Sequence, residues 1–132
     1  MSKVNQIEAV DLFCGVGGLT CGLSHAGVIV KAGYDIDRAC EYSYNENNKA
    51  TFVAKSIDEV SGAEIGKWYT PGVIRLLAGC APCQPFSTLA NGRDTKDDKK
   101  WGLLGEFARL ISKIQPELVT MENVPRVTNH SP

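Results

Sequence analysis

The stretch that decides the fold is "IEAVDLFCGVGGLTCGL", residues 7–23. Residues 7–13 predict a short strand, and residues 19–27 predict a helix that stops at a glycine. The turn between strand and helix contains three glycines, Gly15, Gly17 and Gly18. Glycines at such a place permit a tight turn and allow a ligand to approach the backbone. A strand, a glycine turn and a helix together indicate the first unit of an α/β fold.

The rest of the chain continues this alternation. Further strands are predicted at residues 28–36, 51–57, 73–80 and 117–124. Helices are predicted from Asp37 to about residue 47, briefly after residue 57, and over residues 103–114, where Pro116 follows. Strands that alternate with helices favour a Rossmann-like, doubly wound and mostly parallel sheet. The length of 132 residues suits one domain.

Ligands of such sheets bind beyond the carboxyl ends of the strands. This rule selects four stretches, "FCGVGG", "YDID", "GCAPCQ" and "MENV". Asp35 ends the second predicted strand, 20 residues after Gly15, where a carboxylate typically accepts hydrogen bonds from ribose hydroxyls. Position 20 is Thr, so the dinucleotide fingerprint G-x-G-x-x-G is not met. An adenosine-type ligand without a pyrophosphate therefore fits better than NAD.

Cys83 is a candidate nucleophile. It lies between Pro82 and Gln84–Pro85, and the prolines stiffen the turn that would hold the thiol. A helix that begins near Pro85 would favour the thiolate. Glu122 and Asn123 lie at the end of the fifth predicted strand, beside the cysteine turn. A carboxyl group buried there would have a raised pKa and could donate a proton.

The pair Cys80 and Cys83 also fits C-x-x-C, which occurs in redox sites and zinc sites. Redox motifs of this kind come near the start of their fold, whereas this pair follows four predicted strands. A structural zinc ion needs about four ligands. The other cysteines, Cys14, Cys21 and Cys40, are irregularly spaced. We therefore expect no metal, although the redox and zinc interpretations are not excluded by the pattern.

The charge and the cysteine count restrict the partners and the compartment. The formal net charge is −1, so the chain lacks the strongly basic character of a self-sufficient nucleic-acid-binding protein. Five cysteines make an odd number, and no signal-like apolar run follows Met1. Both observations predict reduced thiols and a cytoplasmic location. No apolar run approaches the roughly 20 residues of a membrane span, so no membrane partner is expected.

In combination, these stretches resemble the N-terminal part of a cytosine-5 DNA methyltransferase of the bacterial restriction-modification type. "DLFCGVGGL" (11–19) is similar to the family's first motif, and "YDID" with "NENN" to the second. "APCQPFS" (81–87) resembles the catalytic Pro-Cys motif, "LLGEFARLI" the fifth motif, and "MENV" (121–124) the Glu-Asn-Val motif. The five motifs occur in family order and span nearly the whole chain.

The resemblance implies a class I methyltransferase fold, S-adenosylmethionine as cofactor, S-adenosylhomocysteine as product and double-stranded DNA as substrate. Cys83 would attack C6 of a flipped cytosine, Glu122 would act at N3, and Pro82 and Asn123 would complete the catalytic group. Asp35 would hold the ribose, and Ile36 would pack on the adenine. The full set of implied cofactor residues is Phe13, Gly15, Gly17, Gly18, Leu19, Asp35, Ile36, Ser56, Ile57 and Leu103.

Two departures from the family pattern matter. An acid often precedes the Ile of the third motif and binds the adenine amine, but Ser56 precedes Ile57 here, and Asp58 follows it. The family's later motifs and its target-recognition domain cannot fit after residue 124. Residues 1–132 are therefore expected to be an incomplete catalytic domain, inactive alone, that needs a missing C-terminal part or a separate target-recognition subunit.

The connecting segment, residues 84–102, resembles the family's DNA-closing loop. Its basic residues could meet phosphates, although Asp94, Asp97 and Asp98 dilute their charge; they are Arg93, Lys96, Lys99 and Lys100. Two alternative functions are a tRNA cytosine-5 methyltransferase and a non-catalytic cofactor-binding or regulatory fragment.

Overall fold

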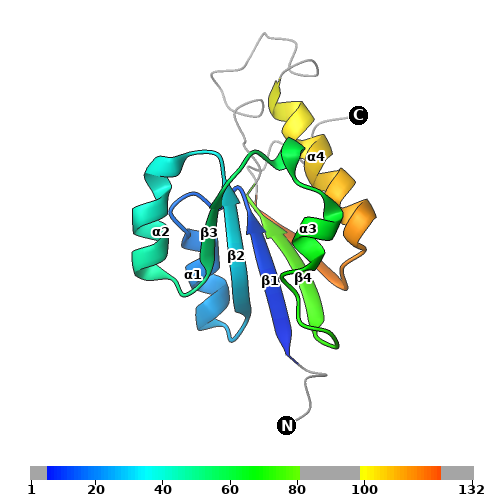
Figure 1. The fold of residues 1–132 in the computed structure, drawn as a ribbon. Helices are drawn as coiled ribbons and strands as arrows, with labels where there is room; N and C mark the ends of the chain where they lie inside the picture. Colours follow the sequence, from blue (N-terminus) through cyan, green and yellow to red (C-terminus); the bar gives the residue numbers. More distant parts are fainter. Residues whose placement is uncertain (1–5, 81–98, 123–132) are drawn as a thin grey trace.

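The computed structural model describes residues 6–80 and 99–122. Five strands form one sheet in the order β3-β2-β1-β4-β5, and every pairing is parallel (Figure 1). The strands are β1 (Ile7–Leu12), β2 (Ile29–Asp35), β3 (Thr51–Ala54), β4 (Ile74–Gly79) and β5 (Leu118–Met121). The predicted α/β sheet is thus confirmed, with β1 at its centre.

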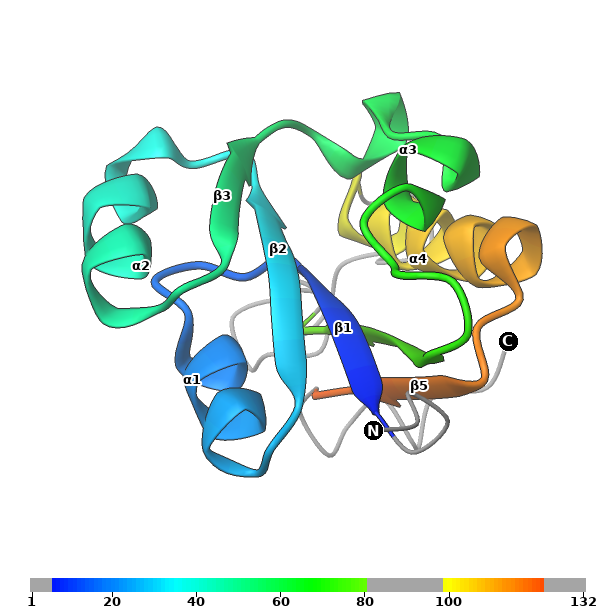
Figure 2. The same ribbon diagram turned by 60° about the horizontal axis from the view of Figure 1, so that its bottom comes forward.

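The helices cover both faces of the sheet. Figure 2 shows α1 and α2 on one side of the strands and α3 and α4 on the other. The α-helices are α1 (Gly18–His25), α2 (Glu41–Asn47), α3 (Gly62–Gly66) and α4 (Lys99–Ile114), and the 3₁₀ turns are η1 (Arg38–Cys40) and η2 (Ile57–Glu59). In the described parts of the chain, no helix is both long and apolar enough to cross a membrane.

Alternate residues of β1 explain the two layers. Val10 and Leu12 join the core cluster that includes Phe107 of α4, whereas Ala9 joins the cluster that includes Tyr44 of α2. Successive side chains of a strand point to opposite faces, so a central strand that is apolar on both faces needs helices on both. This is the doubly wound arrangement that the sequence predicted.

Several boundaries differ from the predicted ones. Strand β3 ends at Ala54 rather than at Ile57, because the chain turns into η2 and Ile57 is buried in the core there. Helix α4 begins at Lys99, so the end of the predicted connection 84–102 is helical instead. Lysine is a good helix former, and the 16-residue helix continues through Gly102 and Gly105. The predicted cap is confirmed, because the Asp37 side chain accepts from Ala39 N at the start of η1.

Arg75 fixes the end of α4 to the sheet. Its guanidinium donates to the carbonyl oxygens of Ile114 and Gln115 at 3.1 and 2.8 Å and to the carboxylate of Glu117. Carbonyl groups at a helix C-terminus have no partner within the helix, so Arg75 supplies their donors. The same arginine lowers the pKa of Glu117 to about 2.

Candidate functional site

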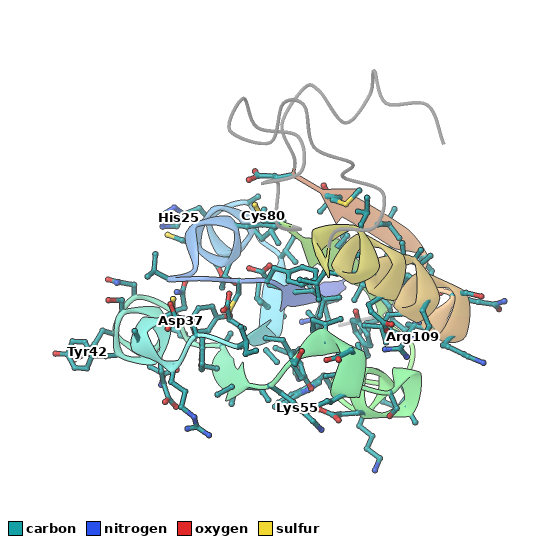
Figure 3. The ribbon with its side chains drawn as sticks, turned by 90° about the horizontal axis from the view of Figure 1, so that it is seen from above. His25, Asp37, Tyr42, Lys55, Cys80 and Arg109 are labelled. Carbon is teal, nitrogen blue, oxygen red and sulfur yellow. The ribbon has the colours of Figure 1, made fainter. Side chains whose placement is uncertain are left out.

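The predicted stretches meet along the carboxyl edge of the sheet. Backbone hydrogen bonds continue the strand pairing one or two residues past the strand ends: Cys14 N to Tyr34 O (3.0 Å), Cys80 N to Leu12 O (3.2 Å) and Glu122 N to Gly79 O (2.9 Å). The glycine turn, the start of the cysteine turn and Glu122 are therefore neighbours. Figure 3 looks onto this edge, with Cys80 labelled.

The glycine turn has an unusual backbone. Phe13, Gly15 and Gly17 all have positive φ angles, of 55°, 55° and 96°. This conformation costs glycine little, but a phenylalanine adopts it only where the surrounding structure imposes it. Phe13 lines a cavity and also packs against the core, so the strained residue lies at the candidate site.

Asp35 ties the glycine turn to the end of β2. Its carboxylate accepts from Gly15 N at 2.8 Å and from Asp37 N at 2.9 Å. Each carboxylate oxygen can accept more than one hydrogen bond, so capacity is left for hydroxyl donors of a ligand. The sequence predicted the position of Asp35 but not its bond to Gly15.

A buried polar group supports the turn from below. Thr20 donates to Asp11 Oδ2 at 2.6 Å, and the hydroxyl groups of Thr20 and Tyr44 lie 3.0 Å apart. A Cβ on Gly17 would lie 2.8 Å from the Tyr44 ring, and a Cβ on Gly33 would lie 2.5 Å from its hydroxyl. Glycine at both positions therefore lets Tyr44 fill the space under the turn.

Asp11 is fully buried in this group, and burial is the main cause that raises its pKa to about 6. The hydrogen bond from Thr20 opposes the shift. Among the residues that the structure describes, Asp11 Oδ1 has no hydrogen-bond partner. Burial likewise raises the pKa of the Cys14 thiol, so Cys14 is an inert side chain rather than a second nucleophile.

A cavity of about 580 Å³ lies at this edge of the sheet. Six of the predicted cofactor residues line it: Phe13, Asp35, Ile36, Ser56, Ile57 and Leu103. The sequence did not identify its other lining residues, which are Lys55, Asp58, Cys80, Gly102 and Glu106. Glu106 could have been found, because it lies three residues after Leu103 and so on the same face of the helix.

The lining of the cavity is acidic and partly apolar. Asp35, Asp58 and Glu106 contribute carboxylates, and the one lysine of the lining, Lys55, is paired with Glu64 at 2.7 Å. Ile36 is 73% exposed, which is high for an isoleucine and leaves an apolar surface at the cavity. The combination suits a ligand that carries positive charge and has a flat apolar part.

The third-motif region differs from the family pattern in a definite way. Ser56 donates its hydroxyl hydrogen to Asp58, and both side chains line the cavity. Asp58, which follows Ile57, therefore lines the same cavity as Ser56, which precedes Ile57.

Other predicted residues lie elsewhere. Gly15, Gly17, Gly18 and Leu19 are not in the cavity lining, and Leu19 packs against the core on the α1 side. Glu122 is exposed, so the burial that a proton donor needs is not supplied by the described residues. Pro82, Cys83, Asn123 and the predicted basic residues Arg93 and Lys96 lie outside the described residues, and the side chains of Lys99 and Lys100 are likewise not described.

The metal interpretation gains no support within the described ranges. In residues 6–80 and 99–122, no group of three or more His, Cys, Asp or Glu side chains is arranged to hold a metal ion. His25, in α1, is exposed.

A comparison with known families decides the assignment. The family model described as C-5 cytosine-specific DNA methylase matches residues 7–132. The chain belongs to this cytosine-5 DNA methylase family. The resemblance drawn from the five motifs is therefore confirmed at the level of the family.

Individual relatives agree with this family assignment. The chain is 49% identical over 118 residues to the type II methylase M.HgiDII of Herpetosiphon aurantiacus, a match that covers 89% of this chain and 33% of that protein. A solved structure described as a DNA modification methyltransferase encoded within a prophage (E. coli) matches with a TM-score of 0.73 and 28% identity, over 92% of this chain and 33% of that one. The S. pombe Dnmt2 methyltransferase matches with a TM-score of 0.69 and 18% identity, over 96% of this chain and 37% of that one, which shows a shared fold.

The chain spans about a third of the length of the first curated relatives that it matches.

Proposed function

We propose that this chain is the cofactor-binding and catalytic part of an enzyme that transfers a methyl group from S-adenosylmethionine to C5 of cytosine in double-stranded DNA. The observation that carries the proposal is the cavity at the carboxyl edge, whose lining includes six residues predicted for the cofactor. The end of β4 borders this cavity through Cys80, three residues before Cys83.

The cavity fits this cofactor chemically. When bound, S-adenosylmethionine supplies an electrophilic methyl group on a positively charged sulfur. The carboxylates of Asp35, Asp58 and Glu106 favour such a positive charge. Asp35 retains acceptor capacity for ribose hydroxyls, and the exposed Ile36 offers a surface to the adenine. Asp58, held by Ser56, is the acceptor that we propose for the adenine amine.

The chain's own residues would then act on the flipped cytosine. The Cys83 thiolate adds to C6, while Glu122 donates a hydrogen bond or proton at N3. These two steps make C5 nucleophilic enough to take the methyl group. Methyl transfer would release S-adenosylhomocysteine as the leaving group. Loss of the C5 proton to a water molecule acting as base would then expel the Cys83 thiolate and restore the ring, which regenerates the enzyme. Pro82 would stiffen the turn, and Asn123 would complete the group next to Glu122.

A further part of the enzyme is needed in this proposal. Residues 1–132 are the N-terminal portion of the catalytic domain, and target recognition belongs to a C-terminal part or a separate subunit. The partial match to the first curated relatives supports this proposal, because the chain covers only about a third of their length. We propose a cytoplasmic location, which the reduced thiols of Cys14, Cys21 and Cys40 support.

The test mixes the chain with a candidate C-terminal chain, labelled S-adenosylmethionine and either duplex DNA or tRNA. We expect label on DNA cytosine, and we expect Cys83→Ser to lower the rate by at least about 10³-fold. Cys21→Ser, in α1 and outside the cavity, is the matched control and should keep the rate. Methyl transfer that survives Cys83→Ser would refute the nucleophile, and preferred labelling of tRNA would favour an RNA substrate.

Calorimetry tests the remaining alternative function, a non-catalytic fragment. The isolated chain should bind S-adenosylhomocysteine, because six of the residues predicted for the cofactor line the cavity. No binding by the chain, and no rescue by the C-terminal chain, would favour the non-catalytic fragment.

A further inference from the structure

Arg109 of α4 makes an unusual set of contacts. Its Nη2 atom donates to the backbone carbonyl oxygens of Ile57 and Val60, at 3.1 and 2.9 Å. Its Nε atom donates to the carboxylate of Glu106, one turn earlier in the same helix. The carbonyl oxygens belong to η2 and the residue after it, which are about fifty positions away in the sequence.

These contacts join two walls of the cavity. One wall is η2 and its approach, which contribute Ser56, Ile57 and Asp58 to the lining. The other wall is the start of α4, which contributes Gly102, Leu103 and Glu106. Arg109 is not itself a lining residue, so it has no direct route to a ligand. In Figure 3 its label lies between α4 and the segment that carries α3.

The η2 wall has little internal support. It is a single 3₁₀ turn of three residues, held by the bonds from Glu59 N to Ser56 O and from Val60 N to Ile57 O. Short 3₁₀ turns have poor hydrogen-bond geometry, so their shape depends on outside contacts. A guanidinium offers several donors in a fixed plane and can bind both carbonyl groups and Glu106 at once, which an ammonium group does less well.

We infer that Arg109 is a positioning residue that holds η2 at a fixed distance from α4 and so sets the width of the ligand cavity. The inference concerns geometry that is present without a ligand, and it rests on the proposed function only for the ligand's identity. Glu106 orients the guanidinium and lines the cavity, so the same ion pair also fixes one carboxylate of the ligand site.

Arg75 provides a matched control. It too is a partly buried arginine that donates to two backbone carbonyl groups and one carboxylate, and it binds the other end of α4. It lines no part of the cavity. Loss of either arginine removes similar bonds, but only Arg109 connects the two walls.

The experiment compares Arg109→Gln, Arg109→Lys and Arg75→Gln in the chain as it stands. Calorimetry measures the Kd for S-adenosylhomocysteine, and amide hydrogen exchange without ligand measures the opening of η2. We expect Arg109→Gln to raise the Kd roughly tenfold, Arg109→Lys to restore part of the affinity, and Arg75→Gln to leave the Kd unchanged. The exchange rates of the Glu59 and Val60 amides should rise in Arg109→Gln. In Arg75→Gln the same two rates should equal those of the wild type.

Two results would overturn the inference. One is unchanged exchange at Glu59 and Val60 in Arg109→Gln, and the other is an equal rise in Kd for both glutamine variants. If the wild-type chain binds no S-adenosylhomocysteine, either alone or with the C-terminal chain, the proposed function fails instead. The exchange measurement then still decides whether Arg109 holds η2.

Discussion

At the scale of single residues, burial and hydrogen bonding determine what each carboxylate near the site can do. Asp35 is partly exposed and binds two backbone amides, so it can orient the glycine turn and still meet a ligand. Asp11 is fully buried in β1, and among the described residues its side-chain hydrogen bond is with Thr20. Identical side chains therefore differ in what they can do, because one remains hydrated and the other does not.

Asp11 should make the stability of the chain depend on pH. Burial raises its folded-state pKa from 3.8 to about 6, so the folded chain holds this proton more tightly than the unfolded chain. The resulting stabilisation is complete below about pH 4 and is lost as the pH rises through about 6. The change corresponds to about 3 kcal/mol. Urea unfolding at pH 4.5, 5.5 and 7 should show this decline in the wild type and a smaller one in Asp11→Asn.

The exposed Glu46 of α2 offers a control for that experiment. Glu46→Gln removes a carboxylate without touching the buried group and should keep the wild-type decline. An unaltered decline in Asp11→Asn would show that other groups carry the pH dependence.

At the scale of elements, α4 can lie close to the sheet only because β4 ends in a glycine. A Cβ on Gly79 would lie 2.4 Å from Cε2 of Phe107 and 3.2 Å from the carbonyl oxygen of Leu12. Phe107 is 2% exposed and is part of the core, so its ring has little room to move away. The packing of the helix that lines the cavity thus depends on one missing methyl group.

Gly79→Ala should destabilise the fold by about 1–3 kcal/mol, because overpacking forces the ring or the helix to shift. Thermal unfolding measures the loss. Gly66→Ala in α3, where a Cβ meets nothing within 4 Å, is the matched control and should be neutral or slightly stabilising. If Gly79→Ala is as stable as Gly66→Ala, the contact with Phe107 does not limit the packing.

The sequence predicted the elements better than their connections. The order of strands and helices and the Asp37 cap follow from local residue patterns, which require no knowledge of the tertiary structure. The end of β3 and the start of α4 could not be predicted, because burial of Ile57 and packing of α4 decide them. The bond from Asp35 to Gly15 was not anticipated, and neither was the bond from Arg109 to η2. Both join segments that are distant in the sequence, and no local pattern encodes such pairs.

At the scale of the whole molecule, the sheet is unevenly covered. In the part of the chain that the structure describes, β5 is hydrogen-bonded to β4 and lies at the edge of the sheet order. Leu118, Val119 and Met121 are 44%, 45% and 41% exposed, so apolar side chains project from both faces of this strand. A strand edge with exposed apolar side chains promotes association between chains.

The isolated chain should therefore associate in a concentration-dependent way, and Val119→Lys should reduce the association. A charge on an edge strand opposes pairing with another strand. Analytical ultracentrifugation over a range of concentrations is the measurement. Tyr42→Lys removes an exposed aromatic side chain from α2, away from the edge, and should not change the behaviour. Equal effects of the two substitutions would point to general surface hydrophobicity rather than the strand.

The central position of β1 also has a consequence for the order of folding. The strands on the β2 side pair over short stretches of chain, whereas β1 pairs with β4 across a long one, with Ile7 opposite Ile74. Long-range parallel strand pairs form slowly. Helix α4, which contributes to the cavity lining, follows strands β1 to β4 in the chain and precedes β5. A ligand that needs both Phe13 and Leu103 can therefore bind only a chain whose folding is nearly finished. Such a ligand would shift the equilibrium toward the folded state, because it binds that state and not the unfolded chain. The cofactor would therefore stabilise a newly synthesised chain in addition to its role in the reaction.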